Sequence, residues 1–113
     1  MVQAYVQDPL CGGAYSTRLG RDLVEGLRDV FKTSVGGGYQ QTPKDLPLYL
    51  FSGALDPLSE NGEGVRALAK LMQNAGIKDV TMRLYDGMRH ETLNEVGRQQ
   101  VFTDLTDWMS ARL

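Results

Sequence analysis

The sequence has only one cysteine and one histidine among its 113 residues. A single cysteine excludes an intrachain disulfide and any metal site built from several cysteines. This favours a reducing compartment, and we expect a cytoplasmic protein. The histidine, His90, has no second nitrogen or sulfur ligand at helical spacing, whereas zinc motifs combine several such ligands. We therefore expect no bound metal.

Basic residues and long apolar runs are also scarce. The chain has 12 Lys and Arg against 14 Asp and Glu, which gives a formal net charge of −2 and argues against a nucleic-acid partner. No apolar run approaches the roughly 20 residues that span a bilayer, so we expect no transmembrane segment. The N-terminus also lacks a secretory signature. A hydrophobic content of 42% and this length suit one small globular domain.

Hydrophobic spacing predicts an α/β fold. We expect helices, with one apolar face each, over about residues 17–32, 61–75 and 94–112. We expect strands over about residues 46–52 and 80–85. Two strands joined by a helix form a right-handed crossover, so these strands should be parallel.

Local signals refine this outline. Ser16 or Thr17 can cap the first helix, and Gly76 is placed for a left-handed C-cap after the second, with Ile77 as its hydrophobic contact. Residues 1–15 contain Asp-Pro and Gly-Gly breaks, so we expect irregular structure there. Residues 36–45 predict a polar linker loop.

An acid and the histidine each follow one of the predicted strands. Asp56 lies in Gly53-Ala54-Leu55-Asp56-Pro57, and His90 follows the strand that ends at Tyr85. The carboxyl ends of parallel strands share one edge of a sheet, so the two side chains should come within hydrogen-bonding distance. An aspartate that accepts from one imidazole nitrogen fixes the tautomer and stabilises the imidazolium. This pattern predicts the acid and base of a hydrolase triad.

Other interpretations of these residues stay open. Asp56-Pro57 is also a common turn signal, and a lone histidine is often just a surface polar residue. Asp86 is a competing acid, but Asp86-Gly87 is typical of a turn in the same loop as His90. Glu91, next to the histidine, is a further candidate for orienting the loop.

No nucleophile is evident. A nucleophile elbow reads Gly-x-Ser-x-Gly between a strand and a helix, and no serine has that setting. Ser52 comes nearest, but Leu50 stands where the first glycine belongs. Cys11 has no close basic neighbour, so we expect a packed residue instead of a reactive thiol. The glycine triplet 36–38 precedes the acid, which is the wrong order for an oxyanion loop.

Two segments carry a family resemblance. SGALDPLSENG and YDGMRHETLNE resemble the C-terminal third of α/β-hydrolases of the monoacylglycerol lipase, lysophospholipase and serine aminopeptidase S33 group. In that group one strand leads to a Gly-x-x-Asp-Pro acid loop and the next to Tyr-x-Gly-x-x-His-Glu. The resemblance implies that Asp56 is the triad acid and His90 the general base. It also implies a lipid-like carboxylic ester substrate and no cofactor.

The resemblance also implies a division of the chain. Residues 5–10 are similar to the segment that follows the cap, so residues 1–35 would be the end of the cap region and its return helix. Residues 36–113 would be the C-terminal part of the core. The elbow and oxyanion loop are not in this sequence, so we expect a fragment that is inactive alone, with self-association through an exposed sheet edge. The alternative is a non-catalytic α/β remnant or interaction module that pairs with another chain.

Overall fold

The protein is described by a computed structural model that covers residues 2–32 and 38–113. The chain divides into two compact units, Met1–Lys44 and Asp45–Leu113. The division that we predicted near residue 35 concerns the roles of the two parts in the family, and it stays a prediction.

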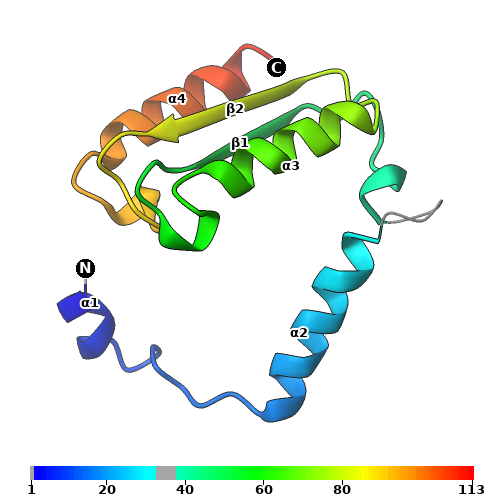
Figure 1. Ribbon diagram of the computed structural model, residues 1–113. Coiled ribbons are helices and arrows are strands. Elements are labelled where there is room, and N and C mark those ends of the chain that lie inside the picture. The colour runs from blue at the N-terminus through cyan, green and yellow to red at the C-terminus, as the bar shows by residue number, and fades with distance from the viewer. Residues whose placement is uncertain (1, 33–37) are drawn as a thin grey trace. The chain divides into compact units, whose positions relative to one another are not determined.

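The described residues of the first unit, 2–32 and 38–44, form two α-helices and a short 3-10 helix. They are α1 (Val2–Gln7), α2 (Thr17–Val30) and η1 (Gly38–Gln41) (Figure 1). Helix α1 contradicts the prediction of irregular structure over residues 1–15. The helix can form because the Asp-Pro and Gly-Gly breaks begin only at Asp8, after its last residue. Of the predicted loop 36–45, Gly36 and Gly37 lie outside the described residues, and η1 occupies part of the remainder.

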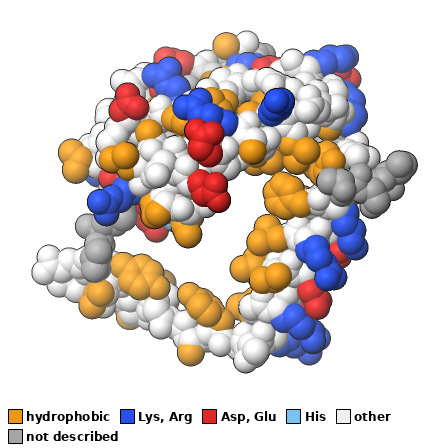
Figure 2. Space-filling view, in the orientation of Figure 1, with side chains coloured by type: hydrophobic (Ala, Val, Ile, Leu, Met, Phe, Trp, Pro, Cys, Tyr) orange, Lys and Arg blue, Asp and Glu red, His pale blue; other side chains and the backbone are white. Residues whose placement is uncertain are grey.

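Helix α2 begins where the sequence predicted. The Ser16 hydroxyl accepts the Leu19 N–H at 3.2 Å and caps the helix. The helix ends at Val30, two residues earlier than expected, and Phe31 closes it by donating its N–H to the Leu27 carbonyl. Hydrophobic side chains gather along α2 and are exposed (Figure 2): they are those of Leu19, Leu23, Val24, Leu27, Val30 and Phe31.

The second unit is a parallel two-stranded sheet with a helix on each face. Strand β1 (Leu48–Gly53) pairs with β2 (Val80–Tyr85) from Leu48↔Val80 to Gly53↔Tyr85. Helix α3 (Glu63–Asn74) is the crossover between them, and α4 (Arg98–Ser110) follows β2. In Figure 1 the strands run between α4 and α3. The predicted α/β class and parallel pairing are confirmed.

Two helices begin later than predicted. Asn61 and Gly62 have φ of 57° and 93°, and this left-handed backbone cannot belong to an α-helix, so α3 begins at Glu63. Before α4, residues Thr92–Asn94 form the 3-10 helix η3, and the α-helix begins only at Arg98. Periodicity alone does not distinguish a tight turn from the first turn of a helix.

The end of α3 follows the prediction. Gly76 adopts φ of 92°, and its N–H donates to the Gln73 carbonyl at 2.9 Å. The Ile77 N–H reaches back to the Met72 carbonyl at 3.2 Å, which completes a Schellman motif. The side chain of Ile77 is buried, as its predicted role as the hydrophobic contact requires.

The core lies between α4 and the sheet. Val101 of α4 is fully buried and packs with Tyr85 and Met88, and Phe51 and Leu105 border this cluster. Full burial of a valine side chain contributes about 1.5–3 kcal/mol. Met88 lies only two residues before the histidine, so the same core that anchors α4 also anchors the histidine loop.

Polar contacts set the position of α4 on the sheet. Trp108 Nε1 donates to Thr81 Oγ1 at 3.0 Å, and Arg83 of β2 lies 3.2 Å from the Asp104 carboxylate.

Burial raises the pKa of Tyr85, and contacts with the Tyr49 hydroxyl and Asp104 raise the pKa further, so this phenol stays neutral.

None of the helices in residues 2–32 and 38–113 combines the length and the hydropathy that crossing a bilayer requires.

Candidate active site

Asp56 occupies the loop that follows β1, here called the acid loop (residues 54–62). Its carboxylate Oδ1 accepts the Leu58 N–H at 3.0 Å and so caps the 3-10 helix η2 (Pro57–Ser59). The turn interpretation of Asp56-Pro57 is therefore correct as well. The Asn61 N–H donates to the Asp56 carbonyl at 2.8 Å. The acid is thus held by its main chain and by its side chain.

The loop after β2, here called the histidine loop (residues 86–91), packs directly against the end of β1. The Leu55 N–H donates to the Met88 carbonyl at 2.9 Å, which joins the two loops. A Cβ added at Gly53 would overlap the carbonyl oxygens of Met88 and Arg89. Only glycine lets the two backbones approach this closely.

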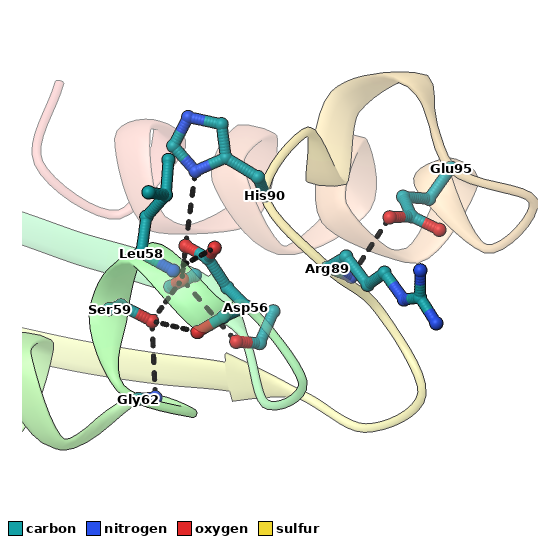
Figure 3. Close-up of polar contacts among 9 residues, drawn as sticks. Asp56, Leu58, Ser59, Gly62, Arg89, His90 and Glu95 are labelled. Carbon is teal, nitrogen blue, oxygen red and sulfur yellow. Dashed lines mark hydrogen bonds and ion pairs between the residues drawn. The ribbon is translucent and has the colours of Figure 1, made fainter. Parts of the chain in front are cut away.

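The structure brings Asp56 and His90 together. His90 Nδ1 lies 3.1 Å from Asp56 Oδ2 (Figure 3). An ionised carboxylate only accepts hydrogen bonds, so Nδ1 carries the proton and Nε2 of the neutral ring is left as the acceptor. In Figure 3 the second ring nitrogen points away from Asp56. The side chain of Asp56 is 4% exposed, whereas that of His90 is 61% exposed.

A carboxylate holds the backbone of the histidine loop. Glu95 Oε1 accepts the N–H of Arg89, the residue before His90, at 2.8 Å (Figure 3). Glu91, which the sequence offered as a candidate for orienting the loop, accepts from the Asn94 side chain at 2.7 Å and lies in the turn that leads to η3. Asp86, the competing acid in the sequence, is exposed in the turn after β2. The acid that pairs with the histidine is Asp56.

Two serines that were not assigned a supporting role from the sequence complete the surroundings of Asp56. The buried Ser52 hydroxyl donates to Asp56 Oδ2 at 3.3 Å, and Ser59 Oγ donates to the Asp56 carbonyl at 3.2 Å. The sequence signal that could have revealed this contact is the presence of a hydroxyl residue, Ser52, in an apolar strand four residues before the acid. Ser52 contacts the carboxylate, not Nε2, so the imidazole base is not placed to deprotonate it.

Opposing effects set the charge of Asp56. Burial is the largest effect and raises the pKa of the carboxyl. Hydrogen bonds from His90, Leu58 and Ser52, together with the positive charge of the imidazolium when His90 is protonated, outweigh the effect of burial, so the pKa of Asp56 lies below its usual value. The site therefore holds an ionised acid beside the imidazole at neutral pH.

Two further expectations concern reactive and metal-binding side chains. Cys11 is exposed, so the prediction that it is packed was wrong; it follows a Pro9 turn with glycines next to it. Among the described residues, no group of three or more His, Cys, Asp or Glu side chains is arranged to hold a metal ion.

The fold and this pair define a class. An aspartate and a histidine that meet beyond the carboxyl ends of two parallel strands, with helices on both faces, are the arrangement of α/β-hydrolases. Residues 1–97 match the sequence model of the family described as "Serine aminopeptidase, S33". The chain belongs to this α/β-hydrolase family, and the resemblance inferred from the two loops is confirmed.

Proposed function

We propose that this chain supplies the acid and the base of a serine hydrolase that cleaves carboxylic esters. Asp56 is the acid and His90 the general base. The observation that carries the proposal is the 3.1 Å contact between Nδ1 and a buried carboxylate, with the imidazole exposed on its other side. A surface histidine with no catalytic role does not require a buried, ionised carboxylate as its hydrogen-bond partner.

The chemistry follows from the tautomer. Nε2 takes the proton of a serine hydroxyl as that oxygen bonds to the ester carbonyl carbon, and Asp56 stabilises the imidazolium. The imidazolium then returns the proton to the alcohol oxygen as the ester bond breaks. Water repeats the sequence on the acyl-enzyme and releases the acid. His90 and Asp56 leave each cycle unchanged.

The nucleophile comes from outside these 113 residues. No Gly-x-Ser-x-Gly occurs in them, and Ser52 contacts the acid rather than the base. A triad without its nucleophile loses several orders of magnitude in rate, so the chain alone is inactive in this proposal.

A fluorophosphonate probe tests this assignment. The chain alone is expected to remain unlabelled, and labelling at any of its serines would overturn the assignment. If the reading frame upstream of Met1 encodes Gly-x-Ser-x-Gly, the longer polypeptide is expected to be labelled at that serine. His90→Ala in the longer polypeptide should then abolish labelling, while Glu91→Ala should not.

The substrate of the proposed hydrolase could be an ester or a peptide, and the two can be distinguished by assay. The family description names an aminopeptidase, whereas the two loops resemble those of lipases that act on monoacylglycerols or lysophospholipids. We favour esters because both the acid loop and the histidine loop resemble those of the lipases. Hydrolysis of p-nitrophenyl acyl esters but not of aminoacyl p-nitroanilides by the longer polypeptide supports this choice, and the reverse preference refutes it.

A second candidate is a non-catalytic module that pairs with another chain. It is favoured by the two-stranded sheet, whose outer strand edges have no partner within residues 45–113, and by the exposed apolar side chains of α2. A promoter and start signal immediately before Met1, with no upstream elbow in frame, would support this candidate over the hydrolase.

We also infer a cytoplasmic location, which rests on the use of a single cysteine. Fractionation of cells that express the chain tests it, and recovery in a secreted fraction would contradict it.

A further inference from the structure

Ser52 is a buried hydroxyl at the end of an otherwise apolar strand. It is 7% exposed, and buried hydroxyls in proteins nearly always have a hydrogen-bond partner. Its partners are Asp56 Oδ2 at 3.3 Å, Ser59 Oγ at 3.3 Å and the Gly53 carbonyl at 3.4 Å. All three lie at the end of β1 or in the acid loop, so the hydroxyl points toward the acid and not into the core.

The direction of these bonds follows from the number of protons. A hydroxyl has one hydrogen and can accept twice. Ser59 Oγ already accepts the Gly62 N–H at 3.1 Å, and it donates its own hydrogen to the Asp56 carbonyl at 3.2 Å. Ser52 is left to donate, and a carboxylate is the strongest acceptor within its reach because the bond is charge-assisted.

We propose that Ser52 is a positioning residue, which holds the carboxylate of Asp56 in the orientation that faces His90. This inference rests on the proposed function of the Asp56–His90 pair. The Leu58 N–H binds Oδ1 at 3.0 Å and Ser52 binds Oδ2, so donors from the loop and from the strand hold the two oxygens. Rotation of the carboxylate about Cβ–Cγ breaks at least one of these bonds.

The orientation of the Asp56 carboxylate determines which tautomer of His90 is favoured. The base needs its hydrogen on Nδ1 and its lone pair on Nε2, and the orientation of Oδ2 decides whether Nδ1–H is favoured. At 3.3 Å the Ser52 bond is longer than the 2.5–3.0 Å usual for hydroxyl donors. We therefore expect its loss to change the orientation of the acid more than the stability of the fold.

The test uses the 113-residue chain and its only histidine. With ¹⁵N labelling, the Nδ1 and Nε2 resonances of His90 give the tautomer ratio without overlap from another imidazole. In Ser52→Ala the Nδ1–H form is expected to lose its dominance, and the pKa of Asp56, followed by its ¹³C carboxyl resonance, is expected to rise. Ser110→Ala is the control, because this serine is exposed at the end of α4 and does not belong to the acid loop; it should keep the wild-type ratio.

A second pair of variants guards against misfolding. Ser52→Thr and Ser52→Val introduce side chains of the same shape, and only threonine keeps the hydroxyl group. Threonine is expected to retain the wild-type ratio and valine to lose it. Equal behaviour of this pair, or a wild-type ratio in Ser52→Ala, overturns the proposal. If neither hydroxyl-free variant folds, Ser52→Thr is read alone: the wild-type ratio supports the proposal, and any other ratio overturns it.

Asp56→Asn separates this inference from the function on which it rests. If the tautomer ratio of His90 is unchanged by Asp56→Asn, the pair itself is not formed and the proposed function fails. If Asp56→Asn changes the ratio and the Ser52 variants do not, only the role of Ser52 fails.

Discussion

Replacing Gly53 by alanine tests how the two loops are held together. Gly53 has no positive φ, so alanine suits its backbone and the cost is steric. The added Cβ would overlap the carbonyl oxygens of Met88 and Arg89, which are backbone atoms and cannot rotate away. The histidine loop must therefore move away from β1, and this movement breaks the 2.9 Å bond from the Leu55 N–H to the Met88 carbonyl.

The magnitude follows from these two effects. Overpacking costs about 1–3 kcal/mol, and the loss of one internal hydrogen bond costs about 0.5–1.5 kcal/mol. We expect Gly53→Ala to lower the free energy of unfolding by about 1.5–4.5 kcal/mol, a large part of the stability of a small domain. Movement of the loop should also separate His90 from Asp56, so the Nδ1–H tautomer should lose its dominance.

The assay is urea unfolding followed by the fluorescence of Trp108, the only tryptophan, which reports on the contact between α4 and the sheet. Gly26→Ala is the matched control: this glycine lies in α2, nothing lies within 4 Å of an added Cβ, and alanine favours helix. Wild-type stability and an unchanged His90 tautomer in Gly53→Ala would refute the reasoning on the close approach of the two loops.

Three further predictions follow from the described contacts. Folding lowers the pKa of Asp56 below its value of 3.8 in the unfolded chain, so the ionised carboxylate stabilises the fold above that pH. This stabilisation is lost as the pH falls through the lower pKa of the folded state. Acid titration followed by circular dichroism should show the loss, and Asp56→Asn should make it smaller. Val101→Ala should lower the free energy of unfolding by about 1.5–3 kcal/mol, measured by urea unfolding, because it opens a cavity in the core; a loss below about 0.5 kcal/mol would contradict the assigned core. The outer edges of β1 and β2 have no partner strand within residues 45–113 and should make the chain self-associate, so sedimentation should give a mass that rises with concentration. A monomer with one cooperative unfolding transition would count against this.

Much of the secondary structure was predictable because local patterns report it directly. The strand over residues 80–85 has the predicted bounds, and the C-cap at Gly76 and Ile77 forms as the residues indicate. The errors lie at boundaries. Asn61 belongs to a left-handed turn of the acid loop, and Asn94 belongs to the 3-10 helix η3, although the sequence predicted an α-helix from each of them onward. Helix α1 was missed because residues near an Asp-Pro break were treated as irregular.

The support of the acid was harder to foresee. Ser52 was considered only as a nucleophile, and its contact with the carboxylate depends on how the acid loop turns back over the end of β1. Glu95 lies beyond the histidine in the sequence, and it holds Arg89 only because the chain reverses after the loop. Both contacts depend on loop paths that periodicity does not encode.

The sequence by itself determined that Asp56 and His90 follow neighbouring strands, because strand-forming patterns and turn signals act over a few residues. It also determined the family, through the residues of the two loops. Only the tertiary structure decided that Gly53 admits the histidine loop, that Asp56 is buried and ionised, and that the imidazole is exposed on its far side. These properties depend on which backbones and donors meet across the edge of the sheet, and such distances between residues far apart in the chain are set by packing.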